Sequence, residues 1–439
     1  MNVIITIKKT TLYNIACTLL YCVAFMLCYV FFLNKHFEYA GFTYYPKNFL
    51  FILLAVFIAI IPIRFFSGYK AISSFICIFI YTVLYIPIIT TFALGSNLSM
   101  LHILGIQLIF MLCMIVLFQA DKFTIKTKYK LLSSKKISRN MLFKAVLWLT
   151  ILSTIYVLYI YRGNLRFVSF DQEVYELRFA NQVLGEGLVI RYLLAWLSNL
   201  FIPICLAYGL VYKKRVYFLV STAACIIIYM ATGSKGIILF PLIFAGLYLL
   251  KKVVSFSKLY LLFTSFLALL LIALLLTYRF SYTLFFAMSM LSFRTIGTGG
   301  YLTMWYYDFF STHPKTYYSH INAVNAITDS YPYGDAGIGQ VIGQHYWVNS
   351  MNANANFWAT DGIAALGLPG IFIATICLFI FLVICNSISK SINKTFVMLA
   401  FVPFIYFILN TSLFSSLLSG GAIFLAIFIF LLKKSAPLK

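Results

Sequence analysis

Two short segments carry the side chains best suited to bind an anionic group. The first is TGSKG, residues 232–236, which lies between two hydrophobic runs. Gly233 suits the end of one helix, Ser234 can cap the next, and Lys235 adds positive charge near the free N–H groups of that helix. Free N–H groups beside an ammonium form an anion site that suits a diphosphate. The alternative is a plain hairpin turn whose lysine extends to water.

The second segment contains Arg279 and Arg294, which flank the apolar run FSYTLFFAMSMLSF. In one α-helix, arginines 15 residues apart lie about 22 Å apart along the axis. They would then be too distant to hold one diphosphate, so either the segment folds back or each arginine pairs with other residues, such as Arg279 with Lys235. Both can also be anchors of an amphipathic helix in the membrane surface. A further arginine, Arg191, lies one turn into the hydrophobic run LVIRYLL.

A general base is most plausible in the segment 278–362, which holds three of the five histidines. A neutral imidazole can accept a proton near pH 7, and we take His345 as the first candidate, ahead of His320 and His313. No DxD or HExxH spacing occurs in the chain, so we expect neither a metal nor another cofactor. The acidic residues of this segment are Asp308, Asp329, Asp335 and Asp361.

Aromatic residues make up 19% of the chain, more than membrane-interface belts usually need. Rings with an apolar face and a polar edge suit sugar rings, although they also pack at the level of lipid headgroups. The residues that we expect to contact a glycan are Trp305, Trp347, Asn356, Trp358 and Asp361.

The elements that position these residues are predicted to be membrane-spanning helices. Of the 439 residues, 63% are hydrophobic and 10% are charged, against about half and a quarter in a soluble domain. This composition excludes a soluble enzyme, a secreted disulfide scaffold and a disordered protein. Because lipid offers no partner to backbone polar groups, only helices or a closed barrel can span it. The apolar runs are long and continuous, as helices require.

About twelve such runs occur, and we read residues 1–439 as a single all-α, polytopic membrane domain. The eighth run and the last two are short, and the last pair can instead be a re-entrant hairpin around residues 410–421. The predicted spans are residues 11–33, 48–66, 71–94, 101–120, 143–161, 188–212, 216–232, 237–250, 259–277, 363–386, 395–411 and 416–432.

The net charge of +23 is distributed unevenly between the two sides of this topology. One side holds 23 of the 33 lysines and arginines and a single acid, Asp121, whereas the other holds the remaining nine acids. The positive-inside rule therefore places both termini and the basic segment 121–142 in the cytoplasm. The segments 162–187 and 278–362 then lie outside. The charge indicates topology, and we expect no nucleic-acid partner.

Together these features resemble bacterial O-antigen polymerases, which are distantly similar to O-antigen ligases. The resemblance rests on twelve spans, the TGSKG turn, one very long outer segment and the stretch NANANFWATDGIAALGLPG, residues 352–370. The ligases carry a His-Asn pair eleven residues before the first glycine of a GxxG. Here the GxxG is Gly367 and Gly370, and the eleventh residue before it is Asn356, followed by Phe357. The ligase histidine is therefore absent, which favours the polymerase form.

The resemblance implies a metal-independent fold like that of C-type glycosyltransferases, in the bacterial cytoplasmic (inner) membrane. The enzyme would transfer a glycan from undecaprenyl diphosphate to the non-reducing end of another lipid-linked repeat unit. Its partners would be these two lipid-linked glycans, the lipid bilayer and a chain-length regulator protein. In this interpretation His345, Arg279 and Arg294 are catalytic, and Lys235, Arg191 and Ser234 bind the diphosphate.

Two other functions stay open at this point. A flippase for the same intermediates also has about twelve spans, but it is expected to carry charges at mid-depth and short outer segments. An O-antigen ligase would use a similar donor with a different acceptor.

Overall fold

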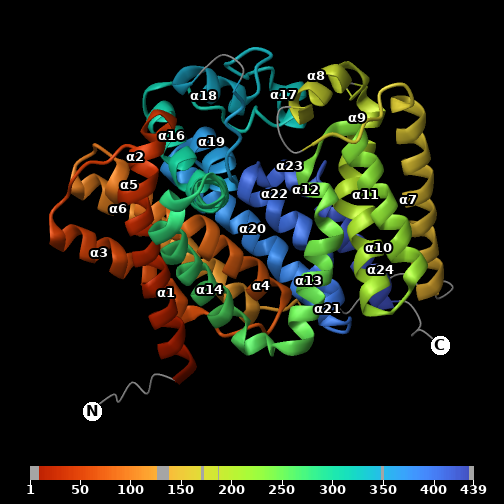
Figure 1. The fold of residues 1–439 in the computed structure, drawn as a ribbon, viewed down its shortest axis with the longest axis horizontal. Helices are drawn as coiled ribbons and strands as arrows, with labels where there is room; N and C mark the ends of the chain where they lie inside the picture. The colour runs from red at the N-terminus through yellow and green to blue at the C-terminus, as the bar shows by residue number, and fades with distance from the viewer. Residues whose placement is uncertain (1–8, 126–137, 170–172, 186, 348–350, 435–439) are drawn as a thin grey trace. The chain divides into compact units, whose positions relative to one another are not determined.

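The computed structural model describes residues 9–125, 138–169, 173–185, 187–347 and 351–434. Every regular element in these ranges is a helix (Figure 1). The chain divides into two compact units, each assembled from three separate segments. The first unit contains residues 1–123, 256–383 and 407–414, and the second contains residues 124–255, 384–406 and 415–439. Most of the predicted cytoplasmic segment 121–142 lies outside the described residues.

All twelve predicted spans are largely helical, and eight of the described helices are long and apolar enough to cross a membrane. The structure is therefore that of an all-helical, multi-pass membrane protein. Two shorter apolar helices span Phe49–Phe65 and Lys394–Asn410. The eight long helices are Thr10–Ala40, Ile72–Gly95, Met100–Lys122, Arg139–Tyr161, Leu188–Val211, Arg215–Thr232, Lys258–Phe280 and Leu368–Ser389.

In the first unit, α1 packs along α14, and α3 packs against α5 and α6. Asn48 and Ser99 cap the N-termini of α3 and α6 by accepting hydrogen bonds from Phe51 N and His102 N. The elements of its N-terminal part are α1 (Lys9–Cys28), η1 (Tyr29–Leu33), α2 (Asn34–Phe37), η2 (Glu38–Ala40), α3 (Phe49–Ile60), η3 (Ile61–Phe65), α4 (Ile72–Phe79), η4 (Ile80–Tyr85), α5 (Ile86–Gly95), α6 (Met100–Gln119) and η5 (Ala120–Lys122).

The segment 278–362, predicted as a long outer connection, is helical for most of its length. Its longest helix, α16, packs against α5 and η9, so the segment is built onto the core of the first unit. The helix before this segment is α14 (Phe256–Thr277) and the one after it is α19 (Ala364–Leu366); the elements between them are η7 (Tyr278–Phe280), α15 (Tyr282–Met288), η8 (Ser289–Gly297), α16 (Thr298–Thr312), α17 (Asn322–Thr328), α18 (Ile338–Tyr346) and η9 (Trp358–Ile363).

In the second unit, α10 and α11 lie side by side and α11 packs against α7 (Figure 1). The helices α20 (Leu368–Ser389), α22 (Val402–Asn410) and α23 (Leu413–Leu417) contribute residues to both units. The elements of the second unit are α7 (Arg139–Tyr161), α8 (Glu173–Gly185), α9 (Leu188–Trp196), η6 (Leu197–Phe201), α10 (Ile202–Val211), α11 (Arg215–Thr232), α12 (Lys235–Ile238), α13 (Phe240–Val253), α21 (Lys394–Ala400) and α24 (Ala422–Lys434).

Wide π-helical turns interrupt several long helices, and proline accounts for two of them. The π-turns η4 and η6 come directly before the helices that carry Pro87 and Pro203 in their first turn. Proline has no N–H and its ring clashes with the carbonyl of the preceding turn, so the helix widens there. The helix therefore continues through η4 from α4 to α5, and through η6 from α9 to α10.

Candidate functional site

A polar pocket of about 520 Å³ lies in the first unit, lined mostly by the segment 278–362 that is predicted to be outside the membrane. Amide and hydroxyl side chains dominate its lining, in contrast to the apolar faces of the surrounding helices. The lining residues include Tyr306, Ser319, His320, Asn322, Asn325, Tyr331, Asp335, Gln340, Asn352, Asn354, Thr360 and Ser412. Such a concave site with converging polar groups is the usual form of a small-ligand site.

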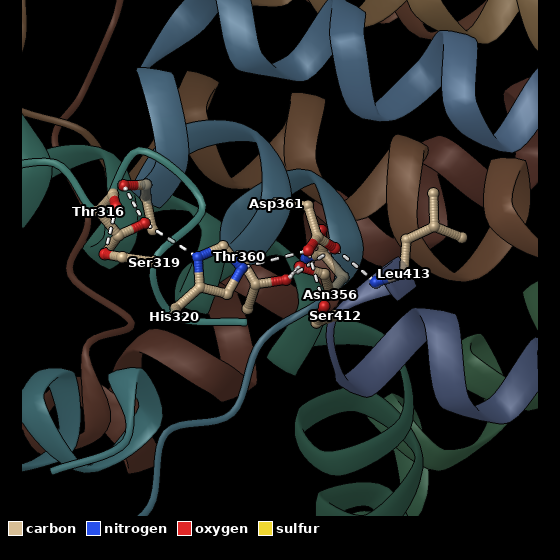
Figure 2. A network of polar contacts seen from close by, with 9 residues as sticks. Thr316, Ser319, His320, Asn356, Thr360, Asp361, Ser412 and Leu413 are labelled. Carbon is tan, nitrogen blue, oxygen red and sulfur yellow. Dashed lines mark hydrogen bonds and ion pairs between the residues drawn. The ribbon is translucent and has the colours of Figure 1, made fainter. Parts of the chain in front are cut away.

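His320 lines this pocket and is held by partners on both ring nitrogens (Figure 2). Its Nε2 lies 3.3 Å from Oδ1 of Asp361, and its Nδ1 lies 2.9 Å from Oγ1 of Thr316. Asp361 is completely buried. A buried carboxylate that accepts a hydrogen bond from an imidazole fixes the orientation of the ring, as in catalytic triads. The pair is therefore arranged for proton transfer at the pocket wall.

The Asp361 carboxylate also holds two parts of the chain together. It accepts hydrogen bonds from Ser412 Oγ at 2.7 Å, from the backbone N–H of Leu413 at 2.5 Å and from Thr360 Oγ1 at 3.4 Å (Figure 2). Together with His320 these donors occupy the four lone-pair positions that a carboxylate offers. Leu413 begins α23, so Asp361 caps this helix from a distant part of the sequence.

Asn356 fixes the start of η9, the helical turn that carries Asp361. Its Oδ1 accepts from the backbone N–H groups of Trp358 and Ala359, at 3.0 and 3.2 Å, and so caps the first turn of η9. Its Nδ2 donates to Thr303 Oγ1 at 2.8 Å, which ties η9 to α16. Asn356 is fully buried, so its role in this structure is to position η9 and Asp361.

The turn that precedes His320 has an unusual backbone. Tyr317 and Tyr318 have φ values of +47° and +67°, in the left-handed region that non-glycine residues rarely adopt. The backbone N–H groups of Thr316 and Tyr317 donate to the carbonyl oxygens of Ala364 and Ala365, which holds the turn on α19. Such strain costs about 1–3 kcal/mol per residue and concentrates at functional sites. This strained turn places the His320 side chain next to Asp361.

The opposite wall of the pocket comes from the NANAN stretch and α18. Asn352 and Asn354 are exposed toward the pocket, whereas the intervening Ala353 is buried. Ala353 N donates to Gly339 O at 2.8 Å. A Cβ atom at Gly339 would lie 2.2 and 2.4 Å from the Oδ1 atoms of the two asparagines. A side chain at position 339 would therefore displace both asparagine side chains, and it would also lie 3.0 Å from Asn354 N.

Tyrosines at the pocket keep their protons at physiological pH. Burial, with a smaller contribution from the neighbouring Tyr333, raises the pKa of Tyr331 to about 12. Burial also raises the pKa of Tyr318 to about 12, with Asp361 among the contributing charges. The Tyr331 hydroxyl donates to Ala336 O at 2.9 Å. The Tyr331 phenol acts as a neutral hydrogen-bonding group, whereas the Tyr318 hydroxyl is buried without a hydrogen-bond partner among the described residues.

Of the residues predicted to contact a glycan, Trp358 and Trp305 are occupied by packing. Trp358 is completely buried and its indole N–H donates to Thr375 Oγ1 at 2.9 Å. Trp305 is largely buried and stacks on Tyr346, with 4.8 Å between ring centroids. Trp347 stacks on Tyr39 and donates its indole N–H to the Tyr39 carbonyl. None of the three tryptophans lines the polar pocket.

His345, our first candidate for a base, lies on α18 outside the pocket lining. Its ring contacts Phe309 and His313, with centroid distances of 5.1 and 5.3 Å. Neither histidine contacts Asp361 in the described part of the chain. The geometry therefore favours His320 over both as the acid–base residue.

Arg279 and Arg294 belong to the same unit as the pocket but do not line it. The segment between them is not one helix: Ser281 is extended between η7 and α15, and α15, which continues into η8, packs against α14 and η7. Arg279 Nε donates to the Tyr278 hydroxyl at 3.1 Å, and its guanidinium lies 5.5 Å from that ring centroid. The Arg294 guanidinium lies 5.1 Å from the Phe293 centroid. Both arginines are exposed, so both are accessible to an anionic headgroup.

Lys235, Ser234 and Arg191 belong to the second unit. Gly233 ends α11 in the left-handed conformation, as its position in TGSKG predicts. Ser234 makes no capping hydrogen bond, contrary to our expectation, and α12 is only four residues long. A single helical turn aligns few peptide dipoles, so charge at this turn comes mainly from side chains. Arg178 of α8 donates to Gly233 O at 2.9 Å and adds a second cation to the turn.

From the sequence His320 was the second candidate for a base, after His345, and neither the pocket asparagines nor Ser412 were identified. In NANAN, asparagine and alanine alternate, and this alternation predicts an extended segment with one polar face and one apolar face. Comparison with protein-family models, with curated proteins and with solved structures finds no match to this chain.

Proposed function

We propose that this chain polymerises lipid-linked oligosaccharide repeat units on the outer face of the bacterial cytoplasmic membrane. The observation that carries the proposal is the polar pocket whose wall holds His320 against the buried Asp361. A pocket rich in amides and hydroxyls suits a glycan, and a histidine oriented by a carboxylate suits removal of a hydroxyl proton. The many apolar helices suit a substrate that stays attached to a lipid.

In the proposed reaction, His320 Nδ1 takes the proton from a hydroxyl of the acceptor glycan. Nδ1 faces the Thr316 hydroxyl, which also lies 3.2 Å from the carbonyl oxygen of Ala364. The acceptor hydroxyl reaches the lone pair of Nδ1 when the Thr316 side chain rotates away, because the Thr316 oxygen otherwise occupies that position. Asp361 accepts from Nε2–H and stabilises the positive charge that the ring acquires.

The bond changes then follow a simple exchange at the anomeric carbon of the donor. The acceptor oxygen forms a bond to this carbon, and the bond from the carbon to the diphosphate oxygen breaks. The polyprenyl diphosphate leaves with the bonding electron pair, and exposed cations stabilise its charge. We assign this role to Arg279 and Arg294, which are exposed and belong to the same unit as the pocket.

Deletion of the gene in its host bacterium tests the function. We expect surface glycan that carries a single repeat unit, because repeats are made and exported but not joined. Polymer stranded on the lipid carrier would instead indicate a ligase, and absence of repeats from the outer face would indicate a flippase. Ladders of normal length in the deletion strain would refute the proposal.

Complementation of the deletion strain connects the function to the pocket. We expect His320→Gln to leave single repeats, because glutamine cannot act as a base. His102→Gln is the matched control, since His102 belongs to the same unit, does not line the pocket and pairs its ring with the Tyr307 hydroxyl. Equal ladders from both variants, at equal protein levels, would exclude His320 as the base.

A further inference from the structure

We propose that the polar pocket is the acceptor subsite and that it selects a neutral glycan with hydroxyl or N-acetyl groups over an acidic one. This inference rests on the proposed function and adds the substrate class. Its basis is the chemistry of the pocket wall, which offers many neutral donors and acceptors, one exposed carboxylate and no lysine or arginine among the described lining residues.

Amide side chains supply the available hydrogen-bonding groups. Asn325 Oδ1 accepts from Tyr331 N at 3.1 Å, and Gln340 Oε1 accepts from Gly337 N at 2.9 Å. Each of these two amides therefore keeps its NH₂ group for a ligand. Asn352 and Asn354 make no hydrogen bond to any residue that the structure describes, so both ends of their amides are available. An amide pairs well with sugar hydroxyls and with an N-acetyl group, because each is both donor and acceptor.

The charge of the pocket argues against an anionic ligand. Asp335 lies exposed among the lining residues, and Asp361 lies buried behind His320. With no lysine or arginine in the described lining to offset them, a uronate would meet like charge and a loss of hydration. The same reasoning excludes the diphosphate of the donor from this pocket. The acceptor sugar, which carries the attacking hydroxyl, needs a base and no cation. Because the pocket offers a base and no cation, we assign it to the acceptor.

The size of the pocket fits the end of a glycan better than a whole polymer. Its volume of about 520 Å³ falls within the roughly 300–1,000 Å³ that is usual for small-ligand pockets. Tyr331 contributes a ring whose hydroxyl is fixed on Ala336 O, so its orientation is set before a ligand arrives. A preorganised ring of this kind packs on the apolar face of a sugar.

The experiment measures binding of free oligosaccharides to the full-length protein in lipid nanodiscs by calorimetry. The neutral probe is chitotetraose, which carries N-acetyl groups, and the acidic probe is tetragalacturonate. We expect the neutral probe to bind at least tenfold more tightly. Asn352→Leu with Asn354→Leu should weaken it about tenfold or more, since the hydrogen bonds of two amides are lost. Asn97→Leu, an exposed asparagine of the same unit that is not a lining residue, is the matched control.

A second variant tests the charge argument without altering the amides. Asp335→Lys should reduce the preference for the neutral probe by strengthening binding of tetragalacturonate several-fold. Equal binding of both probes to the wild type, or no effect of Asp335→Lys on the acidic probe, would overturn the inference. Failure of both probes to bind would also overturn it, while single-repeat glycan in the deletion strain would still support the proposed function. Selective binding with normal ladders in that strain would refute the proposed function alone.

Discussion

Replacement of Asp361 by asparagine is the sharpest perturbation of the proposed site, because it keeps the shape and removes the charge. Asp361 accepts four hydrogen bonds and is completely buried. In the variant, one oxygen becomes an NH₂ group, which cannot accept. If the NH₂ replaces Oδ1 it faces His320 Nε2–H, and if it replaces Oδ2 it faces the backbone N–H of Leu413. At least one fixed donor therefore loses its acceptor.

The expected magnitude follows from that loss. A buried donor without an acceptor costs about 1–3 kcal/mol. If His320 bears this cost in the transition state, turnover falls about 5- to 150-fold, at 1.36 kcal/mol for each factor of ten. Because Asp361 is not among the pocket-lining residues, we expect kcat to fall while the KM for the acceptor stays within about threefold of the wild-type value.

The assay follows chain growth in membrane vesicles from the host bacterium, which contain its own lipid-linked repeat units. Asp329→Asn is the matched control, since Asp329 is an exposed residue at the end of α17 with a φ of +43°, a conformation that asparagine tolerates well. Thermal unfolding of both variants separates loss of folding from loss of turnover. Wild-type kcat in a folded Asp361→Asn protein would refute the reasoning, because His320 would then need no carboxylate.

Four further outcomes follow from the same structure. Gly339→Ala should weaken binding of chitotetraose in calorimetry, because the new Cβ would lie 2.2 Å from an asparagine oxygen of the pocket wall; unchanged affinity would count against that wall. Gly370→Ala should lower the unfolding temperature, since its Cβ would lie 2.1 Å from a backbone oxygen of η9 and overpacking costs about 1–3 kcal/mol; an unchanged temperature would contradict this. Arg279→Ala and Arg294→Ala should each abolish ladders at normal protein levels, and normal ladders in both would remove the arginines from the site. Because the raised pKa of about 12 keeps Tyr331 protonated, binding should stay level from about pH 8 to about pH 10, and a fall with a midpoint near 10 would show an ordinary phenol.

The helices could be predicted because a bilayer imposes a length and a composition that are visible in sequence. Each apolar run from residues 11–33 to 416–432 is largely helical in the structure. The two compact units were not predictable in the same way. Each is assembled from segments far apart in the chain, so no linker separates them in the sequence.

The site was harder to predict because it depends on contacts between distant residues. His320 and Asp361 lie 41 positions apart, and Asp361 lies 51 positions from Ser412. Nothing local distinguishes His320 from His345, whereas burial and the carboxylate distinguish them at once. Trp358 was predicted to contact a sugar because tryptophan rings often stack on sugars. An apolar ring next to a membrane span packs into the protein core just as readily, and Trp358 is completely buried.

Segment 278–362 is an intermediate case. Its length suggested function, and the pocket lies within it. Its helices α16 and α18 were not predicted: α16 carries many aromatic residues and no clear apolar period, and α18 has an apolar face through Ile338 and Ile342 but is only nine residues long. Their folding depends on tertiary packing, such as that of α16 against α5.

The most direct test of the account is reconstitution of the purified protein in liposomes with the lipid-linked repeat unit of its host. We predict that the wild-type protein forms polymer and releases one polyprenyl diphosphate for each bond made, and that His320→Gln forms none while His102→Gln matches the wild type. Polymer formation by His320→Gln at the wild-type rate, or no polymer from the wild type with an intact fold, would contradict the account.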